Sequence, residues 1–84
     1  VVMCPAQHVY LDMAHSSDPA DWGASWAAFT GLEDVVNWHP VSADAPDIAP
    51  RVAGVQGTFW SEFTTDDDQL PAMLAPRILG VAAR

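Results

Sequence analysis

The chain has 84 residues, half of them hydrophobic, and eleven acidic side chains against three arginines give it a formal net charge of −8. This length allows one small domain at most, with a marginal core. The negative charge argues against nucleic acid and anionic membrane surfaces as partners, because phosphates require a basic patch. No apolar run reaches the roughly 18 residues of a membrane-spanning helix, no signal peptide is visible, and the single cysteine excludes an internal disulfide.

Residues 1–12 predict a first strand, because β-branched residues open it. Pro5 cannot donate to a sheet ladder, so we expect an interruption there and a resumption at residues 9–11. Tyr10 and Asp12 are two residues apart at the end of this strand, so their side chains are expected on the same face. A ring and a carboxylate in one place suit a sugar, since the ring packs on C–H surface and the carboxylate accepts from hydroxyls. The alternatives are a half-buried strand aromatic and a turn-capping carboxylate.

Residues 13–25 predict a loop with turn chemistry at residues 16–19. Trp26 follows it, and from the local pattern alone it is interpreted as an anchor over the core. His15 has no partner at the ligand spacing of a helix, so we expect no metal role for it.

Residues 31–38 predict a short helix that Thr30 caps and whose first turn is acidic. Its apolar positions recur at helical spacing, and Pro40 lies beyond its end. Trp38 is interpreted as a packing residue. Residues 41–50 predict an extended surface loop because they contain two prolines.

A second buried strand is predicted over residues 52–60. Trp60 and Glu62, at its end, repeat the two-residue spacing of an aromatic and a carboxylate. Here the alternative is a Trp that anchors a core strand beside a solvent-facing Glu. A closing helix follows over residues 66–83, and we expect Pro76 to kink or restart it. The acidic residues at its start lack the alternating ligand spacing of a calcium site.

Strands that alternate with helices predict an α/β fold with a parallel sheet and right-handed crossovers. Two parallel strands do not complete such a sheet, because both would be edges. We therefore expect residues 1–84 to be an incomplete domain, made of two βα units from a larger fold. The start at Val1 rather than Met agrees with a piece cut from a longer polypeptide.

An ordered set of motifs extends this interpretation: Tyr10-Leu-Asp12, Trp26, Leu32-Glu-Asp-Val-Val with Pro40, Gly54-Val-Gln-Gly-Thr-Phe-Trp60-Ser-Glu62, and Pro76-Arg77-Ile-Leu. Together they resemble the last quarter of the catalytic domain of a β-N-acetylhexosaminidase of glycoside hydrolase family 20. The resemblance covers nearly the whole chain. It implies strands seven and eight, at residues 1–12 and 52–60, of a (β/α)₈ barrel whose active site lies at the C-terminal ends of the strands. Residues 66–83 would then be the closing helix.

The resemblance also implies an activity and a set of roles. Members of the family remove terminal β-linked N-acetyl-hexosamines with retention, and the substrate's own acetamido oxygen is the nucleophile. By this resemblance Tyr10 donates a hydrogen bond to that oxygen, and Trp60 walls the acetamide pocket or stacks on the sugar. Glu62 would accept from a ring hydroxyl at the far end, and Asp12 with the indole N–H of Trp26 would hold the O6 side. The resemblance implies no metal and no cofactor.

The chain lacks the motif that holds the catalytic residues of the family. The family's general acid lies in a His-x-Gly-Gly-Asp-Glu motif on strand four, and this sequence contains neither an Asp-Glu dipeptide nor a Gly-Gly. Glu33-Asp34, at the exposed start of a helix, is not given that role. We expect the isolated chain to be inactive, and to associate with the remainder of the barrel or with itself.

Two other functions stay open at this point: a non-catalytic carbohydrate-binding or interaction module, and an acidic structural protein without a ligand. The residues before Val1 would discriminate among the three. The sequence does not specify gluco or galacto preference, oligomeric state or cellular location, although members of the family are often secreted, periplasmic or lysosomal.

Overall fold

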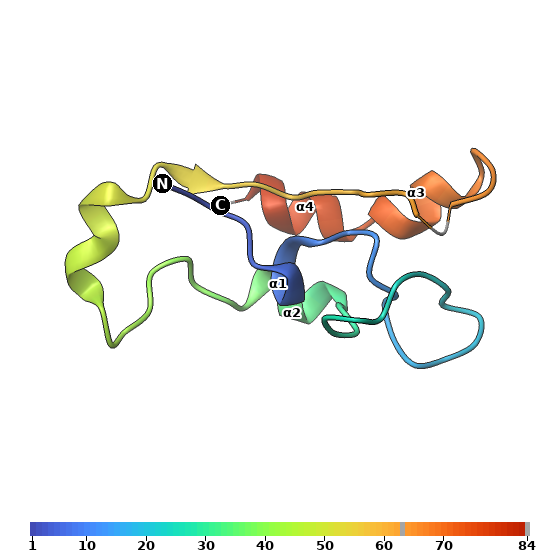
Figure 1. Ribbon diagram of the computed structural model, residues 1–84, viewed down its shortest axis with the longest axis horizontal. Coiled ribbons are helices and arrows are strands. Elements are labelled where there is room, and N and C mark those ends of the chain that lie inside the picture. Colours follow the sequence, from blue (N-terminus) through green and yellow to red (C-terminus); the bar gives the residue numbers. More distant parts are fainter. Residues whose placement is uncertain (63, 84) are drawn as a thin grey trace.

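The computed structural model describes residues 1–62 and 64–83 (Figure 1). Its elements, in chain order, are β1 (Val2–Met3), α1 (Ala6–Val9), α2 (Leu32–Val36), the 3₁₀ helix η1 (Pro46–Arg51), β2 (Gly54–Val55), α3 (Gln69–Leu74) and α4 (Arg77–Ala82). The alternation of strands and helices agrees with the predicted α/β class. The molecule is elongated, with extents of 42 × 21 × 19 Å, and the second extended segment runs along it from η1 towards α3 (Figure 1).

The two strands are parallel, as the sequence predicts, with Val2 opposite Gly54. The first segment leaves the second after Met3 and returns to it near Thr58. There the amide of Thr58 donates to the carbonyl of Val9 at 3.0 Å, and the amide of Leu11 donates to the carbonyl of Thr58 at 2.8 Å. The predicted interruption at Pro5 is therefore confirmed, whereas the predicted resumption at residues 9–11 is limited to a single bridge between Tyr10 and Thr58. The helical turn α1, which begins directly after Pro5, fills the gap.

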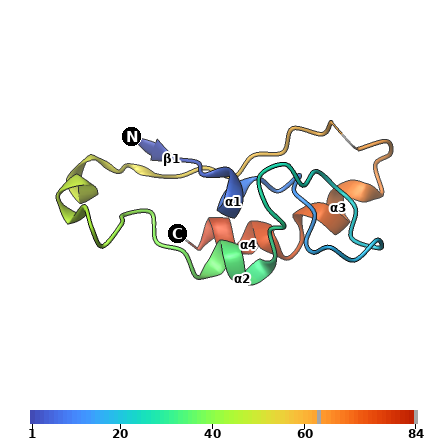
Figure 2. The ribbon, with the colours of Figure 1, turned by 60° about the horizontal axis from the view of Figure 1, so that its bottom comes forward.

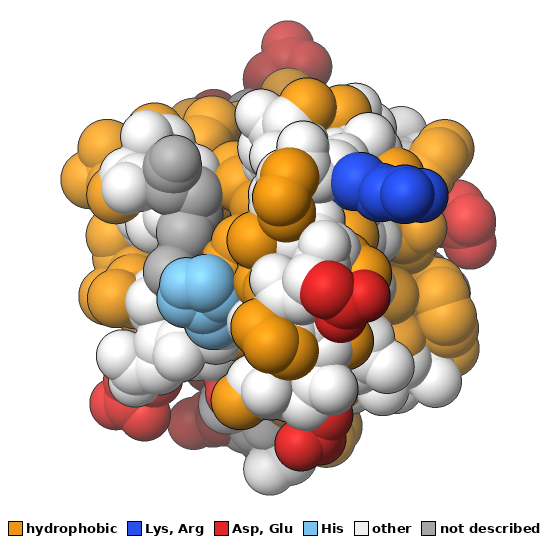
Figure 3. Space-filling view, turned by 90° about the vertical axis from the view of Figure 1, so that its left-hand side faces the viewer, with side chains coloured by type: hydrophobic (Ala, Val, Ile, Leu, Met, Phe, Trp, Pro, Cys, Tyr) orange, Lys and Arg blue, Asp and Glu red, His pale blue; other side chains and the backbone are white. Residues whose placement is uncertain are grey.

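The prediction of buried strands over residues 1–12 and 52–60 is wrong. Regular strand structure is limited to two residues in each segment, and Val1 and Val2 are 74% and 54% exposed. The physical reason is that both strands are edges, and no neighbouring strand extends the ladder or covers the side chains. The end of the molecule that carries η1 likewise shows hydrophobic side chains between separate acidic groups (Figure 3).

The helices form a layer on one side of the extended segments, with α2 beside α4 (Figure 2). Val35 of α2 is fully buried. A Cβ atom at Gly80 of α4 would lie 2.9 Å from the Cγ1 atom of Val35. The absence of a side chain at Gly80 therefore lets the two helices approach closely. The remaining buried hydrophobic residues are Val9, Leu11, Met13, Ala14, Ala24 and Met73. No described helix has the length and apolar character needed to cross a membrane.

Two local predictions, the cap of α2 and the conformation of residues 41–50, need correction. Gly31 rather than Thr30 precedes α2, and its amide donates to the carboxylate of Asp34 at 2.8 Å. The hydroxyl of Thr30 is buried and donates instead to the carbonyl of Gln7 at 3.2 Å. Residues 41–50 are not wholly extended, because Pro46 opens η1, where its fixed φ suits a first helical turn.

The predicted closing helix is divided into α3 and α4, and the break at Pro76 agrees with the expected restart. It begins at residue 69 rather than 66. The side-chain oxygen of Gln69 accepts a hydrogen bond from the amide of Thr65 at 2.7 Å, and the carboxylate of Asp66 accepts from the amide of Asp68 at 3.0 Å. These bonds make the acidic run a turn before the helix.

Candidate functional site

Three aromatic rings from three segments meet at the end of the parallel pair. The ring of Tyr10 lies 6.0 Å from that of Trp26, edge to face, and 5.9 Å from that of Trp60 at an angle of 58°. Tyr10 is half-buried, whereas Trp26 and Trp60 are 68% and 55% exposed. Two large indoles therefore flank one phenol on an open surface, and such apolar surface is typical of a binding site.

The backbone around Tyr10 places this ring beside Trp60. Tyr10 forms a parallel bridge with Thr58, which lies two residues before Trp60 on the second segment. The chain then turns at once, because the amide of Met13 donates to the carbonyl of Tyr10 at 3.2 Å. Tyr10 is thus the last residue of the first segment to form a bridge with the second, just before the turn.

The loop that carries Trp26 is held against the same strand end. The amide of Ala24 donates to the carbonyl of Asp12 at 2.9 Å, and the amide of Ala14 donates back to the carbonyl of Ala24 at 2.8 Å. Gly23, just before this pair, has a φ of +148°, and a Cβ atom there would lie 2.8 Å from the carbonyl oxygen of Asp12. Only glycine fits this backbone conformation and this close approach.

Asp12, two residues after Tyr10, is almost completely buried, at 4% exposure. Its Oδ1 atom is buried and accepts no hydrogen bond from the described residues. Burial raises the pKa of Asp12 above its ordinary value, and the negative charge of Glu62 raises it too, while the backbone amides of Asp12 and Trp60 and the charge of Arg77 lower it. A buried acceptor without a partner is costly, and a hydrogen-bond donor on a ligand would satisfy it.

Glu62 is exposed and lies close enough to Asp12 for their charges to interact. The predicted alternation along regular strands is not what brings the two carboxylates together. Ser61 has a φ of +59°, a left-handed conformation that interrupts the extended segment between Trp60 and Glu62. Asp12 likewise lies in a turn rather than in a strand. The turns at the two strand ends, not strand alternation, therefore direct these carboxylates.

Arg77 contacts the backbone on both sides of Asp12, and the sequence pattern predicted no role for it. It is fully buried. Its five N–H groups donate to the backbone carbonyls of Leu11, Met13, Thr30 and Met73. Burial lowers the pKa of Arg77 to about 10, so the guanidinium stays charged at neutral pH. The available signal was a charged residue inside the apolar stripe of the closing helix.

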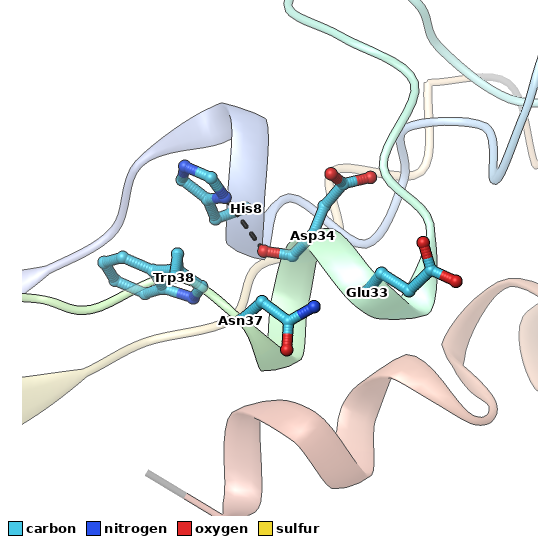
Figure 4. Close-up of a pocket in the computed structure, with 5 residues that line it drawn as sticks. All are labelled: His8, Glu33, Asp34, Asn37 and Trp38. Atoms are coloured by element: carbon cyan, nitrogen blue, oxygen red, sulfur yellow. Dashed lines mark hydrogen bonds between the residues drawn. The ribbon is translucent and has the colours of Figure 1, made fainter.

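A separate cavity of about 350 Å³ lies away from the aromatic cluster, and it is lined by His8, Glu33, Asp34, Asn37 and Trp38. The rings of His8 and Trp38 are stacked, with centroids 5.1 Å apart (Figure 4). This contact supports the interpretation of Trp38 as a packing residue. His15 lies with Nε2 3.0 Å from the carbonyl oxygen of Ala72. Among the described residues, no three His, Cys, Asp or Glu side chains are grouped so that they could hold a metal ion.

Comparison with known proteins places this chain in a family. The family model for the catalytic domain of glycosyl hydrolase family 20 matches residues 1–84, so the chain belongs to that family. Over 83 residues it is 37% identical to the β-N-acetylhexosaminidase of Cellulomonas fimi, and over 85 residues it is 32% identical to a β-hexosaminidase of Vibrio furnissii. Each alignment covers 98% of this chain and only 16% or 14% of the relative.

Solved structures show the same relationship in three dimensions. The family 20 β-N-acetylhexosaminidase of Streptomyces coelicolor A3(2) superposes with a TM-score of 0.83 at 37% identity, over 96% of this chain and 16% of that one. The exo-β-N-acetylglucosaminidase of Vibrio harveyi, solved in complex with N-acetylglucosamine, gives a TM-score of 0.82 at 36% identity, over 98% and 13% of the two chains. Family membership implies a catalytic domain of the TIM-barrel type, and the chain spans about a sixth of the relatives it matches.

Proposed function

We propose that residues 1–84 form the seventh and eighth βα units of the catalytic barrel of an exo-acting β-N-acetylhexosaminidase, as its C-terminal part. The enzyme would hydrolyse terminal N-acetyl-hexosamine residues by substrate-assisted catalysis with retention. The observation that carries the proposal is the convergence of the rings of Tyr10, Trp26 and Trp60 at the strand end that is followed by the buried Asp12. The solved relative from Vibrio harveyi, in complex with N-acetylglucosamine, supports the substrate class.

In this proposal Tyr10 is the residue nearest the chemistry. Its hydroxyl donates a hydrogen bond to the acetamido oxygen of the substrate, which orients that oxygen towards the anomeric carbon and balances charge as the bond forms. Trp60 packs against the acetamide or the sugar face, and its 55% exposure leaves an indole surface free for that contact. The tilted contact between the two rings supports their action on one substituent.

The carboxylates and the second indole position the rest of the sugar. Asp12, whose Oδ1 atom has no hydrogen-bond partner among the described residues, accepts from the O6 hydroxyl through its carboxylate, and the indole N–H of Trp26 donates to the same side. Glu62, which is exposed, accepts from a ring hydroxyl at the far end, at O4. Charge-assisted hydrogen bonds of this kind contribute roughly 1.5–3 kcal/mol each.

The general acid and its aspartate partner belong to the polypeptide outside residues 1–84 in this proposal, since the sequence holds no Asp-Glu dipeptide. The same observation favours the second candidate, a carbohydrate-binding module that has the sugar-facing residues without catalysis. Both candidates predict binding of the sugar, but only the enzyme predicts its hydrolysis.

The test is hydrolysis by the complete polypeptide that contains these residues. We expect release of the phenol from an aryl N-acetyl-β-glucosaminide and not from the aryl β-glucoside, which lacks the acetamide nucleophile. Proton NMR of the first product should show the β-anomer. Equal rates on both glycosides would contradict substrate assistance. Binding of N-acetylglucosamine without hydrolysis would support the module instead.

A further inference from the structure

We propose that Arg77 is a positioning residue of this site: by fixing the backbone carbonyls on both sides of Asp12, it sets where Asp12 presents its carboxylate to the sugar. The inference rests on the proposed function, and it adds a residue that touches no substrate and acts through the backbone.

The geometry around Asp12 is the first step. Arg77 donates from Nη2 to the carbonyl of Leu11 at 2.6 Å and from Nη1 to the carbonyl of Met13 at 2.7 Å. The carbonyl of Asp12 itself accepts from the amide of Ala24 at 2.9 Å. Three consecutive carbonyls are therefore held. The peptide plane before Asp12 cannot rotate without breaking a charge-assisted hydrogen bond from Arg77, and the plane after it cannot rotate without breaking the bond from the amide of Ala24.

Arg77 also joins the two ends of the loop that carries Trp26. This loop leaves the strand end at Met13 and returns at Thr30, whose carbonyl accepts from Nη1 at 2.8 Å. The amide of Thr30 in turn donates to the carbonyl of Ala14 at 2.8 Å. The Nε atom of Arg77 donates to the carbonyl of Met73 in α3 at 3.1 Å. One side chain thus connects the strand end, the loop base and the closing helices.

A purely structural role explains this arrangement less well. An apolar side chain would fill the same space without the cost of burying a charge. A guanidinium, however, has five donors in a rigid fork and can hold several carbonyls in one fixed geometry. Every donor of Arg77 is used in this way, and its charge interacts favourably with that of Asp12. Two of these bonds end on Leu11 and Met13, the residues that flank the proposed sugar contact.

The experiment compares two substrates on the complete polypeptide: an aryl N-acetyl-β-glucosaminide and its 6-deoxy analogue, which lacks the O6 hydroxyl. The readout is the ratio of their kcat/KM values. A loss of folded enzyme lowers both values equally and leaves the ratio unchanged, so the ratio reports the Asp12 contact and not the stability of the fold. Asp12→Asn is the benchmark.

Two variants and two matched controls are measured. Arg77→Lys keeps the charge and loses the fork, and Arg77→Gln loses both. Arg51→Lys and Arg51→Gln make the same chemical changes at an exposed arginine of η1. Because the ratio is independent of yield, the milder Lys variant decides the question if Arg77→Gln fails to fold.

We expect wild type to prefer the 6-hydroxyl substrate by roughly tenfold or more, the size of one charge-assisted hydrogen bond, and Asp12→Asn to lose most of that preference. Both Arg77 variants should lose at least half of it, whereas both Arg51 variants should keep it. Arg77 variants of low activity with the wild-type ratio would overturn the inference and leave the proposed function intact. A wild type without hydrolysis would overturn both. A wild type that hydrolyses without the preference would overturn the inference and the O6 contact of Asp12.

Discussion

The ring centroids of Tyr10 and Trp60 lie 5.9 Å apart, although the two residues come from segments far apart in the sequence. We predict that Trp60→Ala weakens the binding of N-acetylglucosamine to the complete polypeptide by roughly threefold to tenfold, the scale of a lost aromatic contact. Isothermal titration measures this change. Trp38→Ala is the control, because Trp38 stacks on His8 outside the cluster. Equal losses in the two variants would contradict a specific role for Trp60.

The burial of the Asp12 carboxylate predicts how the stability of the fold depends on pH. Because the pKa of Asp12 is raised above its ordinary 3.8 in the folded protein, the folded state binds more protons than the unfolded state over a window that begins near that value. The free energy of unfolding therefore falls as the pH rises through this window. Asp12→Asn carries no such proton and should not show this fall.

Thermal unfolding of wild type and Asp12→Asn between about pH 4 and pH 7 tests this sign. We expect the melting temperature of the variant to rise relative to that of wild type as the pH rises. The affinity of the variant for N-acetylglucosamine should be lower by roughly tenfold to a hundredfold. A variant that loses stability relative to wild type towards neutral pH would show that the carboxylate of Asp12 is stabilised, not penalised, by its surroundings.

The close contact of α2 and α4 predicts the effect of a single methyl group. Gly80→Ala places a Cβ atom 2.9 Å from Cγ1 of Val35 and should lower the free energy of unfolding by about 1–3 kcal/mol. Gly54→Ala is the matched control, because nothing lies within 4 Å of its added Cβ atom. Chemical denaturation of both variants gives the comparison. A Gly80 variant as stable as the Gly54 variant would show that the helices move apart at little cost.

Residues 1–84 as an isolated chain should neither hydrolyse glycosides nor stay monomeric. The chain contains no Asp-Glu dipeptide, and its strand edges carry Val1 and Val2 at 74% and 54% exposure, which favours association. Light scattering and an assay on an aryl N-acetyl-β-glucosaminide, made on one sample, test both expectations. A monomer with the turnover of a complete relative would show that the active site lies within these residues.

The sequence predicted which residues lie together at the site, but not the backbone conformation that brings them together. Tyr10 and Trp60 were placed at one end of a parallel pair, and their rings do lie together. The pattern of residues gave no sign of the left-handed conformation of Ser61, because a non-glycine residue adopts such a conformation only where the surrounding structure imposes it. The shortness of β1 and β2 was missed because pairing depends on neighbouring strands, not on β propensity.

Arg77 was missed for a different reason. Helical periodicity treats a charged residue in an apolar stripe as an exception, and the partners of Arg77 are carbonyls of Leu11, Met13 and Thr30. Backbone carbonyls leave no mark on an amino-acid sequence, so a buried arginine with backbone partners becomes visible only in the structure.

The most direct test of the proposed mechanism is the turnover of Tyr10→Phe in the complete polypeptide. The substitution keeps the ring between Trp26 and Trp60 and removes only the hydroxyl proposed to orient the acetamido oxygen. The kcat for an aryl N-acetyl-β-glucosaminide should fall by roughly 10²–10³, as for other single donors to developing charge, with a much smaller change in KM. A Tyr10→Phe enzyme with wild-type kcat would remove Tyr10 from the mechanism and contradict the account.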